Sequence, residues 1–473
     1  MNRNDAPFDF ARYAADVGPS ADLIRQFAAH DAFRSATVEE LVLEDDFHRR
    51  PLRPEDLSFI DFHAPVKAET ITQLPSLASQ RLLLCINELD TTKLPADRSA
   101  EGLQRVAEYY KNDGKILAAR INGFLEAFAF DHLTHAGPVR GVDGMRETLR
   151  EIVRNETAFW SRIFGALGRQ NYVTEGVRFA LIQKWCLAAS KRSALAKADV
   201  TGRFDGLSPD AWPRLMGASS DDDAIRRIAE VCGVTRDLHS YWQFYLSTSL
   251  ASTNLLYGLA ARPQNVLDLY GAAFVAEAEW LAFCCFVGQA AQYLKLESFP
   301  LPANDPAAEL MDRFERMLRG VERLFGERGI TQVGRGMAIA RELGLCAQRD
   351  LGEQLSWLSA IDRYRGIAEA IDRRIAAECP NIDRETFVEP REMCSTTHVH
   401  DDHRLVVIES GKMVFWGNLG MTLELDPGEM VLVPQGRLHG SSVLSPECVY
   451  HQPIIPDVWV DELVSEKGMR IAS

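Results

Sequence analysis

The sequence predicts a protein of several domains, in which all-α N-terminal and central regions are followed by an all-β C-terminal barrel. Apolar residues recur at helical spacing over most of the first 378 residues, whereas short β-rich runs between glycine and proline turns follow from about residue 385. At 473 residues the chain is also too long for one ordinary domain. We therefore expect domains at residues 1–125, 126–378 and 379–473.

The composition limits the class of protein. The net charge is −15, from 67 acidic and 52 basic residues, which argues against nucleic acid or an anionic membrane surface as the main partner. Uninterrupted apolar runs such as Leu281–Val287 are too short to span a bilayer. The nine cysteines contain no C-x-x-C pair, and the N-terminus is polar. These features predict a cytoplasmic protein with reduced thiols.

Helical spacing of apolar residues predicts long helices in the first two regions. In the first region they are Ala21–Ala32, Pro75–Leu89 and Leu103–Phe128. In the second they include Thr235–Leu259, Pro263–Leu294, Pro306–Phe325 and Met337–Cys379. The first region holds no catalytic constellation, and we expect it to serve packing or dimerisation.

Beyond Cys379-Pro380 the pattern changes to short strands with glycine turns, which is typical of a barrel or sandwich. The expected strands are Thr386–Val388, Leu405–Glu409, Lys412–Trp416, Met421–Leu425, Glu429–Val433 and Cys448–Pro453.

Histidines stand at both ends of the central part of this β region. His398 and His400 are two residues apart, so in a strand they face the same side, and His439 follows a Pro-Gln-Gly turn. The spacing from His398 to Gly411, and from Gly428 through that turn to His439, resembles the two motifs of the cupin family. Cupins are small β-barrels that hold a metal inside. Three imidazoles suit Fe, Zn, Cu or Ni, so the ligand type alone does not choose the metal.

Arg404 stands where cupins usually carry a glutamate ligand. A permanently cationic arginine cannot ligate a metal, so the expected site is reduced to three neutral histidines. Such a set leaves the charge of the metal uncompensated and favours an anionic substrate. Arg404 would either hold a substrate carboxylate or turn outward as a structural ion-pair partner. His403 has the wrong parity in a regular strand and is expected to point away from the metal.

Further segments resemble the N-nitrosourea-forming metalloenzymes of streptozotocin biosynthesis. They are Phe47–Pro54, Asp237–Leu246, Val388–Arg391, Thr397–Asp401 and Glu447–Tyr450. The resemblance implies a helical dimerisation domain, a heme-oxygenase-like helical domain and a C-terminal cupin. In that family a diiron site in the helical domain hydroxylates the guanidine nitrogens of a methylated arginine, and the cupin iron then forms the N–N bond. It also implies that Tyr450 lies in the substrate pocket.

The helical region departs from that family's diiron ligands. His239 is the only histidine between residues 136 and 397, and Lys191 stands near the position expected for the first glutamate. Glu277 alone matches a ligand position, while Asp131 and His135 lie upstream and are expected at the surface. We therefore expect a helical domain without metal.

These observations predict a cytoplasmic, homodimeric non-heme iron enzyme. His398, His400 and His439 would bind one Fe(II) per chain, with O2 as the expected co-substrate and with Tyr450 and Arg404 as candidate catalytic residues. The substrate would be an arginine-derived N-hydroxyguanidine from an upstream N-hydroxylase, and the product an N-nitroso or diazeniumdiolate compound. The alternatives are a three-histidine dioxygenase acting on another small substrate and a non-catalytic cupin that binds a ligand.

Overall fold

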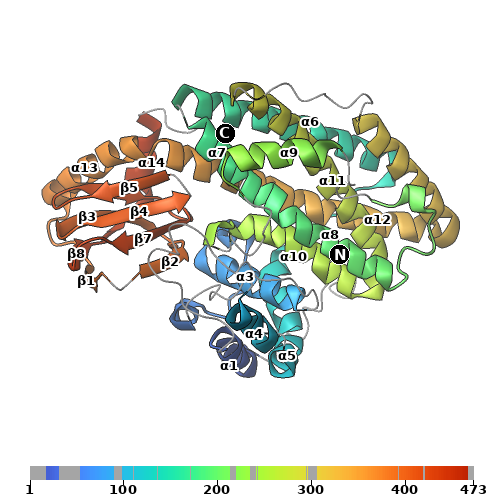
Figure 1. Cartoon of the computed structure of the whole chain (residues 1–473), viewed down its shortest axis with the longest axis horizontal. Helices are drawn as coiled ribbons and strands as arrows, with labels where there is room; N and C mark the ends of the chain where they lie inside the picture. Colours follow the sequence, from blue (N-terminus) through green and yellow to red (C-terminus); the bar gives the residue numbers. More distant parts are fainter. Residues whose placement is uncertain are drawn as a thin grey trace.

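The computed structural model confirms an all-α region followed by an all-β C-terminal region (Figure 1). The long helices lie before Glu378, and the first strand begins at Thr386. The structure describes residues 17–30, 54–89, 99–109, 111–135, 137–170, 172–213, 220–234, 241, 243–294, 296, 306–391, 394–418 and 421–466. Most of Phe47–Pro54, one of the segments that carry the family resemblance, lies outside these residues.

The N-terminal helices form the lower layer in Figure 1. They are α1 (Val17–Ala28), α3 (Leu74–Glu88), α4 (Ala100–Tyr109) and α5 (Asn112–Phe130), with short 3-10 turns η3 (Pro54–Phe59), η4 (Ala68–Thr70) and η5 (Asp131–His135). The helix predicted from Leu103 to Phe128 is therefore two helices, because the backbone of Lys111 is extended. Helix α3 is buried along almost its whole length, so its polar residues must find partners in the interior.

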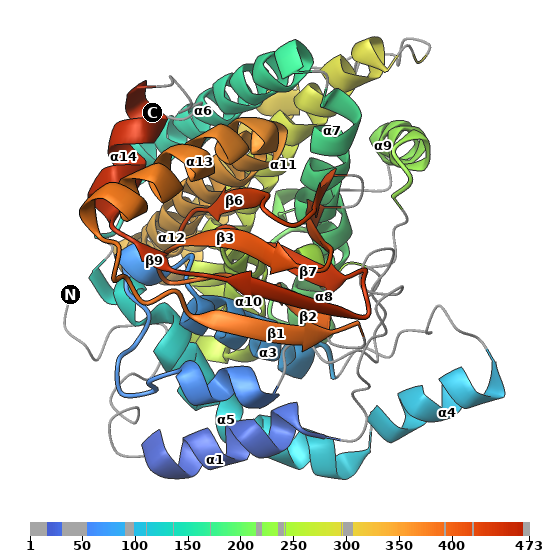
Figure 2. The same ribbon diagram turned by 90° about the vertical axis from the view of Figure 1, so that its left-hand side faces the viewer.

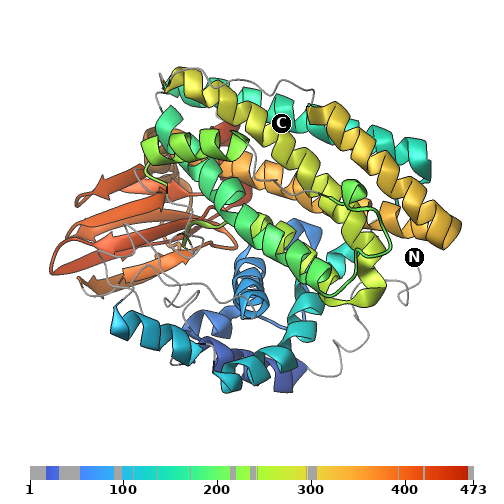
Figure 3. The ribbon, with the colours of Figure 1, turned by 45° about the vertical axis from the view of Figure 1, so that its right-hand side comes forward.

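The central helices form the upper and right-hand layers of Figures 1 and 3. They are α6 (Gly141–Gln170), α7 (Val173–Leu181), the π-turn η6 (Ile182–Cys186), α8 (Leu187–Val200), η7 (Pro209–Ala211), α9 (Ser220–Val231), α10 (Ser247–Ala261), η9 (Pro263–Asn265), α11 (Val266–Tyr293) and α12 (Pro306–Ser359). Gly326 breaks α12 with a φ of 60°, close to the predicted break after Phe325.

The helix predicted from Thr235 to Leu259 is wrong for the described residues before Ser247, which are Tyr241 and residues 243–246. Helix α10 begins only at Ser247, and residues 235–240 lie outside the described chain. The buried Gln183 amide donates to the Phe244 carbonyl at 2.6 Å and accepts from the Leu246 amide at 3.0 Å. The Gln183 side chain thus supplies hydrogen-bond partners to backbone groups that lie just before α10 and outside it.

Helices α11 and α12 approach each other through glycines. A Cβ added at Gly271 would lie 2.1 Å from the Val333 carbonyl oxygen, and one at Gly336 would lie 2.0 Å from that of Asp268. The two backbones are therefore closer than any side chain permits. Close by, Arg335 on α12 pairs through two hydrogen bonds with Asp268 on α11, at 2.6 and 2.5 Å.

Two antiparallel sheets make up the C-terminal region (Figure 2). One has the order β1 (Thr386–Pro390), β8 (Glu447–His451), β3 (His403–Ser410) and β6 (Met430–Val433), with β9 (Ile454–Ile455) on β3. The other has the order β2 (Cys394–His398), β7 (His439–Val443), β4 (Met413–Asn418) and β5 (Met421–Leu425). Buried residues of both sheets, such as Ile408, Phe415 and Val431, share one hydrophobic core.

Helix α13 (Ile361–Glu378) joins this second core, together with Trp357 and the C-terminal helix α14 (Asp457–Glu466). The Trp357 indole donates to the Leu432 carbonyl on β6 at 3.3 Å, and Arg374 of α13 stacks over Trp459 of α14. The predicted boundary after residue 125 falls inside α5, and one core includes residues on both sides of it. The division into domains stays a prediction.

Among the residues that the structure describes, one helical stretch is long and apolar enough to cross a membrane. It is Pro263–Ala291, and 67% of its most apolar window is buried inside the protein. Core helices pass the same test of length and composition, so this stretch is weak evidence on its own. The expectation that no membrane is involved remains a prediction.

The close approach of α11 and α12 predicts opposite effects for two Gly→Ala substitutions on α11. Gly271→Ala should lower the free energy of unfolding by about 2 kcal/mol or more, because its methyl group meets backbone. Gly288→Ala is the control, since nothing lies within 4 Å of its Cβ, and it should be neutral or stabilise by up to about 1 kcal/mol. Urea unfolding measures both, and equal effects would contradict the packing.

Candidate metal centre

The structure brings His398, His400 and His439 together. One nitrogen of each ring lies within 4.8 Å of the others. His398 ends β2 and pairs directly with His439, the first residue of β7, while His400 lies two residues beyond the end of β2. The ring centroids are 4.9 Å apart for His398 and His400, 4.5 Å for His398 and His439, and 5.0 Å for His400 and His439. The paired strands β2 and β7, with the residues that follow β2, thus bring three imidazoles together.

The Nε2 atoms of His400 and His439 suit a metal ion. The Nδ1–H of His439 donates to the Arg437 carbonyl at 2.9 Å, which fixes the tautomer and leaves Nε2 as a lone-pair donor. The Nε2 atoms of His400 and His439 are buried, and neither has a hydrogen-bond partner among the described residues. Buried nitrogens without partners are costly, and ligation of a metal would satisfy them. These residues therefore fit a metal.

Burial keeps two of the imidazoles neutral. It lowers the pKa of His439 to about 3, helped by the neighbouring His398 and opposed by the bond to Arg437. Burial also lowers the pKa of His400 well below its usual value, with further contributions from His398, His439 and Arg404. At neutral pH both rings are in the form that ligates metals.

Aromatic rings hold His439 in its orientation. Phe415 of β4 stacks on it at 5.8 Å with an angle of 18° between the planes, and Trp357 of α12 meets it edge-on at 6.4 Å. His439 is 1% exposed, and all five residues of β7 are buried. Rotation of this ring away from the site would require the surrounding core to move.

Arg404 lies on β3 and is held by groups of its own chain. Its guanidinium forms ion pairs with Asp402 and Glu385 and donates to the Gln452 carbonyl at 3.1 Å. These contacts match the expectation that Arg404 is a structural ion-pair partner. The side chain is only 15% exposed, however, so it does not turn outward. Its charge helps to lower the pKa of His400, so it lies within electrostatic range of that histidine. Its role in catalysis stays a prediction.

Tyr450 lies on β8, which follows β7 in the chain but belongs to the other sheet. Its hydroxyl donates to Glu389 on β1 at 2.9 Å, and its ring stacks on Phe387 at 5.3 Å. The side chain is 5% exposed and belongs to the core between the sheets. The structure thus gives Tyr450 a carboxylate partner, and its role in a pocket remains a prediction.

His403 is not part of the three-histidine group. Its Nδ1 accepts a hydrogen bond from the Gln435 amide at 3.0 Å, and its Nε2 lies 3.8 Å from a carboxylate oxygen of Asp457 on α14. It lines a cavity of about 430 Å³ bordered also by Glu69, Glu353 and Trp357, which none of the three grouped histidines lines.

In the helical region, Lys191 lies in a cluster of buried charges. The cluster also contains Lys184, Glu156 and Glu279, with the Lys184 Nζ 3.7 Å from a Glu279 oxygen. Burial lowers the pKa of Lys191 to about 8 and raises that of Glu156 to about 7. Burial also acts against the charge of Lys184, but Glu156 and Glu279 together raise its pKa.

The residues expected to match or replace diiron ligands do not form a metal group in the described part of the chain, where the three histidines are the one set with suitable geometry. Glu277 instead forms a buried ion pair with Arg313 of α12. Asp131 is partly buried in η5, and the side chain of His135 lies outside the described residues. That the helical domain carries no metal remains a prediction.

Some residues around the site escaped prediction from sequence. Thr397, beside His398, bonds to Arg81 and Gln243, and Leu438, beside His439, bonds to Gln354. Arg81, Gln243 and Gln354 are at most 2% exposed. A buried polar residue within an apolar helix face is the signal that could have singled out Arg81 and Gln354.

Comparison with known proteins supports the resemblance seen in the motifs. No model of a protein family matches the chain. The chain is 27% identical over 454 residues to the nitrosourea synthase of Streptomyces achromogenes subsp. streptozoticus. The match covers 91% of this chain and 94% of that enzyme, so the similarity extends over nearly the whole of both.

Single substitutions test the metal centre. His398→Ala, His400→Ala and His439→Ala should each weaken metal binding by about 100-fold or more, because each would remove one of the three expected ligands. His403→Ala is the matched control and should bind like the unaltered chain. The measurement is metal content after loading and dialysis, together with thermal unfolding. A normal content in any of the first three variants would remove that residue from the site.

Proposed function

We propose that the chain is a mononuclear non-heme iron enzyme that forms an N–N bond from an N-hydroxylated, arginine-derived guanidine. One observation carries the proposal: a group of three histidines, two of which (His400 and His439) have buried Nε2 atoms without a hydrogen-bond partner among the described residues, occurs in a chain similar over 91% of its length to a nitrosourea synthase. The product would carry an N-nitroso or a diazeniumdiolate group.

His398, His400 and His439 would hold the iron through neutral nitrogens. Three imidazoles bind several transition metals, and we favour Fe(II), with O2 as co-substrate, because forming an N–N bond redistributes electrons and Zn(II) has no redox chemistry. When bound, iron would supply open coordination positions for the substrate and O2, together with the electrons that the rearrangement exchanges. A site with no carboxylate ligand keeps a net positive charge and therefore attracts an anionic or chelating N-oxygenated group.

The surrounding residues would orient the substrate. The positive charge of Arg404 acts on His400 and adds to the positive potential of the site, although Asp402 and Glu385 partly neutralise it. The Tyr450 hydroxyl, a proton donor, is hydrogen-bonded to the Glu389 carboxylate, an acceptor. Both residues lie in the C-terminal β region, as the three histidines do. We assign Tyr450 to the substrate pocket, where its hydroxyl would hold or pass a proton of the substrate.

The helical region would serve as scaffold in this proposal. Lys184 and Lys191 already supply positive charge to the buried Glu156 and Glu279. A metal ion placed among them would meet two ammonium groups in a medium of low dielectric constant, which is strongly unfavourable. The chain would then depend on a separate N-hydroxylase for its substrate.

A comparison of substrates tests this function. Iron-loaded protein should convert N-hydroxyarginine or its N-methylated form, whereas the corresponding unhydroxylated arginines should remain unchanged. Product mass spectra and O2 uptake are the measurements. The His398→Ala chain, which lacks one of the three expected metal ligands, is the control. Turnover of unhydroxylated arginine with consumption of two or more O2 would show that the chain also performs the hydroxylations.

Two other results would point to the alternative functions. Turnover of a thiol or a diketone, with none of N-hydroxyguanidines, would indicate a three-histidine dioxygenase with another substrate. Failure of the purified chain to take up any iron would indicate a ligand-binding protein.

The role of Tyr450 is tested by removing its hydroxyl. Tyr450→Phe should lower the turnover of the N-hydroxylated substrate by about 10-fold or more, with metal content unchanged, because the ring remains and only the proton donor is lost. Tyr257→Phe is the matched control, since this buried tyrosine likewise donates to a glutamate, Glu88, but lies in the helical region. Equal turnover in the two variants would remove Tyr450 from the pocket.

A further inference from the structure

Each of the three histidines lies beside a residue that is bonded to the helical region. The neighbours are Thr397 before His398, Asp401 after His400, and Leu438 before His439. Two apolar neighbours, Val399 and Leu438, also belong to the hydrophobic core of the helices and not to that of the sheets. The segments that carry the ligands are therefore packed against the helices.

The contact beside His439 is an amide bridge from α12. The Gln354 side chain donates to the Leu438 carbonyl at 2.8 Å and accepts from the Leu438 amide at 2.9 Å. Gln354 is fully buried, so no water competes for these two bonds. The amide thus gives Leu438 the pair of partners that a neighbouring strand would normally provide.

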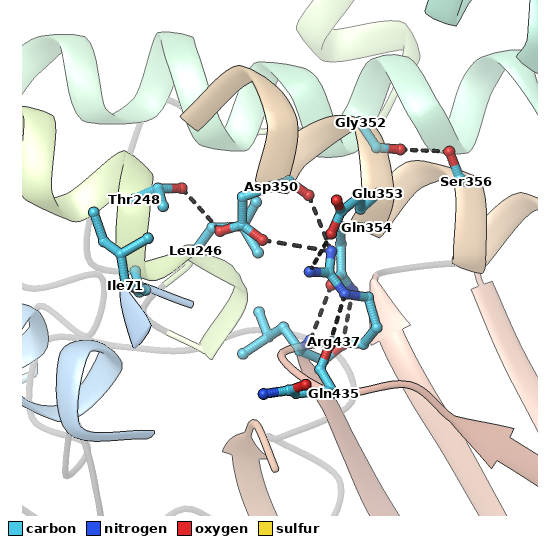
Figure 4. Close-up of polar contacts among 12 residues, drawn as sticks. Ile71, Leu246, Thr248, Asp350, Gly352, Glu353, Gln354, Ser356, Gln435 and Arg437 are labelled. Carbon is cyan, nitrogen blue, oxygen red and sulfur yellow. Dashed lines mark hydrogen bonds and ion pairs between the residues drawn. The ribbon is translucent and has the colours of Figure 1, made fainter. Parts of the chain in front are cut away.

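The preceding residue is held by the same helix (Figure 4). Arg437 donates to the Asp350 carbonyl at 3.1 Å and to the Glu353 carboxylate at 2.9 Å, and its guanidinium lies 3.4 Å from the Asp350 carboxylate. The Asp350 carboxylate in turn accepts from Thr248 of α10 at 2.9 Å. Because the Arg437 carbonyl accepts from His439, this network extends from α10 and α12 to the ring of a ligand.

The contact beside His398 lies where the pairing of β2 with β7 is interrupted. The register of β2 with β7 shifts between Ser395 and His398. At this point the Thr397 amide donates to the Gln243 side chain at 2.9 Å, and Arg81 of α3 donates to the Thr397 carbonyl and hydroxyl, both at 2.9 Å. Such an irregularity re-aims the side chain that follows it, here His398.

The loop beyond His400 is bonded to the start of α3. The Leu74 amide donates to Asp401 at 3.0 Å, and the Gly436 amide donates to the His400 carbonyl at 3.0 Å. Gly436 has a φ of +70°, and a Cβ there would lie 2.8 Å from the Thr72 hydroxyl. The His400 backbone is thus fixed from the turn that leads to His439, and that turn packs on residues just before α3.

We propose that Gln354, Arg81 and Gln243 are positioning residues of the metal centre: the helices hold the backbone beside the ligands and thereby set the geometry of the three imidazoles. This inference rests on the proposed metal binding and assigns to the helical region a role in it without any metal of its own. Residues that orient metal ligands typically affect metal affinity by about 10- to 100-fold when they are changed.

Titration with Co(II) alone tests this inference, because its visible absorption reports the coordination geometry. Gln354→Met keeps the side-chain volume but loses both bonds to Leu438, and it should weaken Co(II) binding by about 10- to 100-fold and shift the absorption bands. Thr397→Val removes the hydroxyl that bonds Gln243 and Arg81, and it should act in the same direction.

The matched control is Asn254→Leu. Asn254 is 1% exposed and donates to the Gln80 carbonyl at 2.8 Å, entirely within the helices. It should lower thermal stability with the affinity and spectrum of Co(II) unchanged. If Gln354→Met and Thr397→Val bind Co(II) like the unaltered chain, the inference is overturned while the metal centre stands. If the unaltered chain binds no Co(II) or Fe(II), the metal centre itself is overturned.

Discussion

The geometry of the three histidines depends on hydrogen bonds that cross from the helices to an interrupted strand. The ladder between β2 and β7 is irregular just before His398, and buried backbone at such a point must find partners elsewhere. Arg81 and Gln243 provide them for Thr397, and Gln354 does the same for Leu438. The sheets alone would leave these backbone groups unpaired. The helices are therefore part of the structure of the site and not an attachment to it.

Cationic side chains stand at two positions where carboxylate ligands were expected, and in both cases the chain balances them internally. Arg404 pairs with Asp402 and Glu385 in the β region. Lys191 lies with Lys184 among buried glutamates in the helical region. The consequences differ because the β region retains three histidines whose ring nitrogens can bind a metal, whereas the carboxylates in the helices already face ammonium groups.

The successes and failures of prediction have physical causes. Strand β5 was found because its apolar residues alternate with polar ones, and β6 because it is a short apolar run bounded by Pro427-Gly428 and Pro434. The bounds of β2 and β7, Cys-Ser-Thr-Thr-His and His-Gly-Ser-Ser-Val, were not predicted, because small polar residues hide their period. A strand was expected only at His398 and His400, and β2 ends at the first of these. Strands β2 and β7 carry two of the three histidines. The start of α10 was misplaced because the Gln183 side chain satisfies backbone that a longer helix would have used.

Three features could be read from the amino-acid sequence: the order of an all-α and an all-β region, the identity of the three histidines, and an arginine at position 404 in place of a carboxylate. Each of these follows from residue type and short-range spacing. The groups that surround the histidines became visible only in the folded chain, because Gln354 and Arg81 lie 84 and 316 residues away from the residues that they hold. Contacts at such separations depend on how the helices pack against the sheets, and no local pattern records that packing.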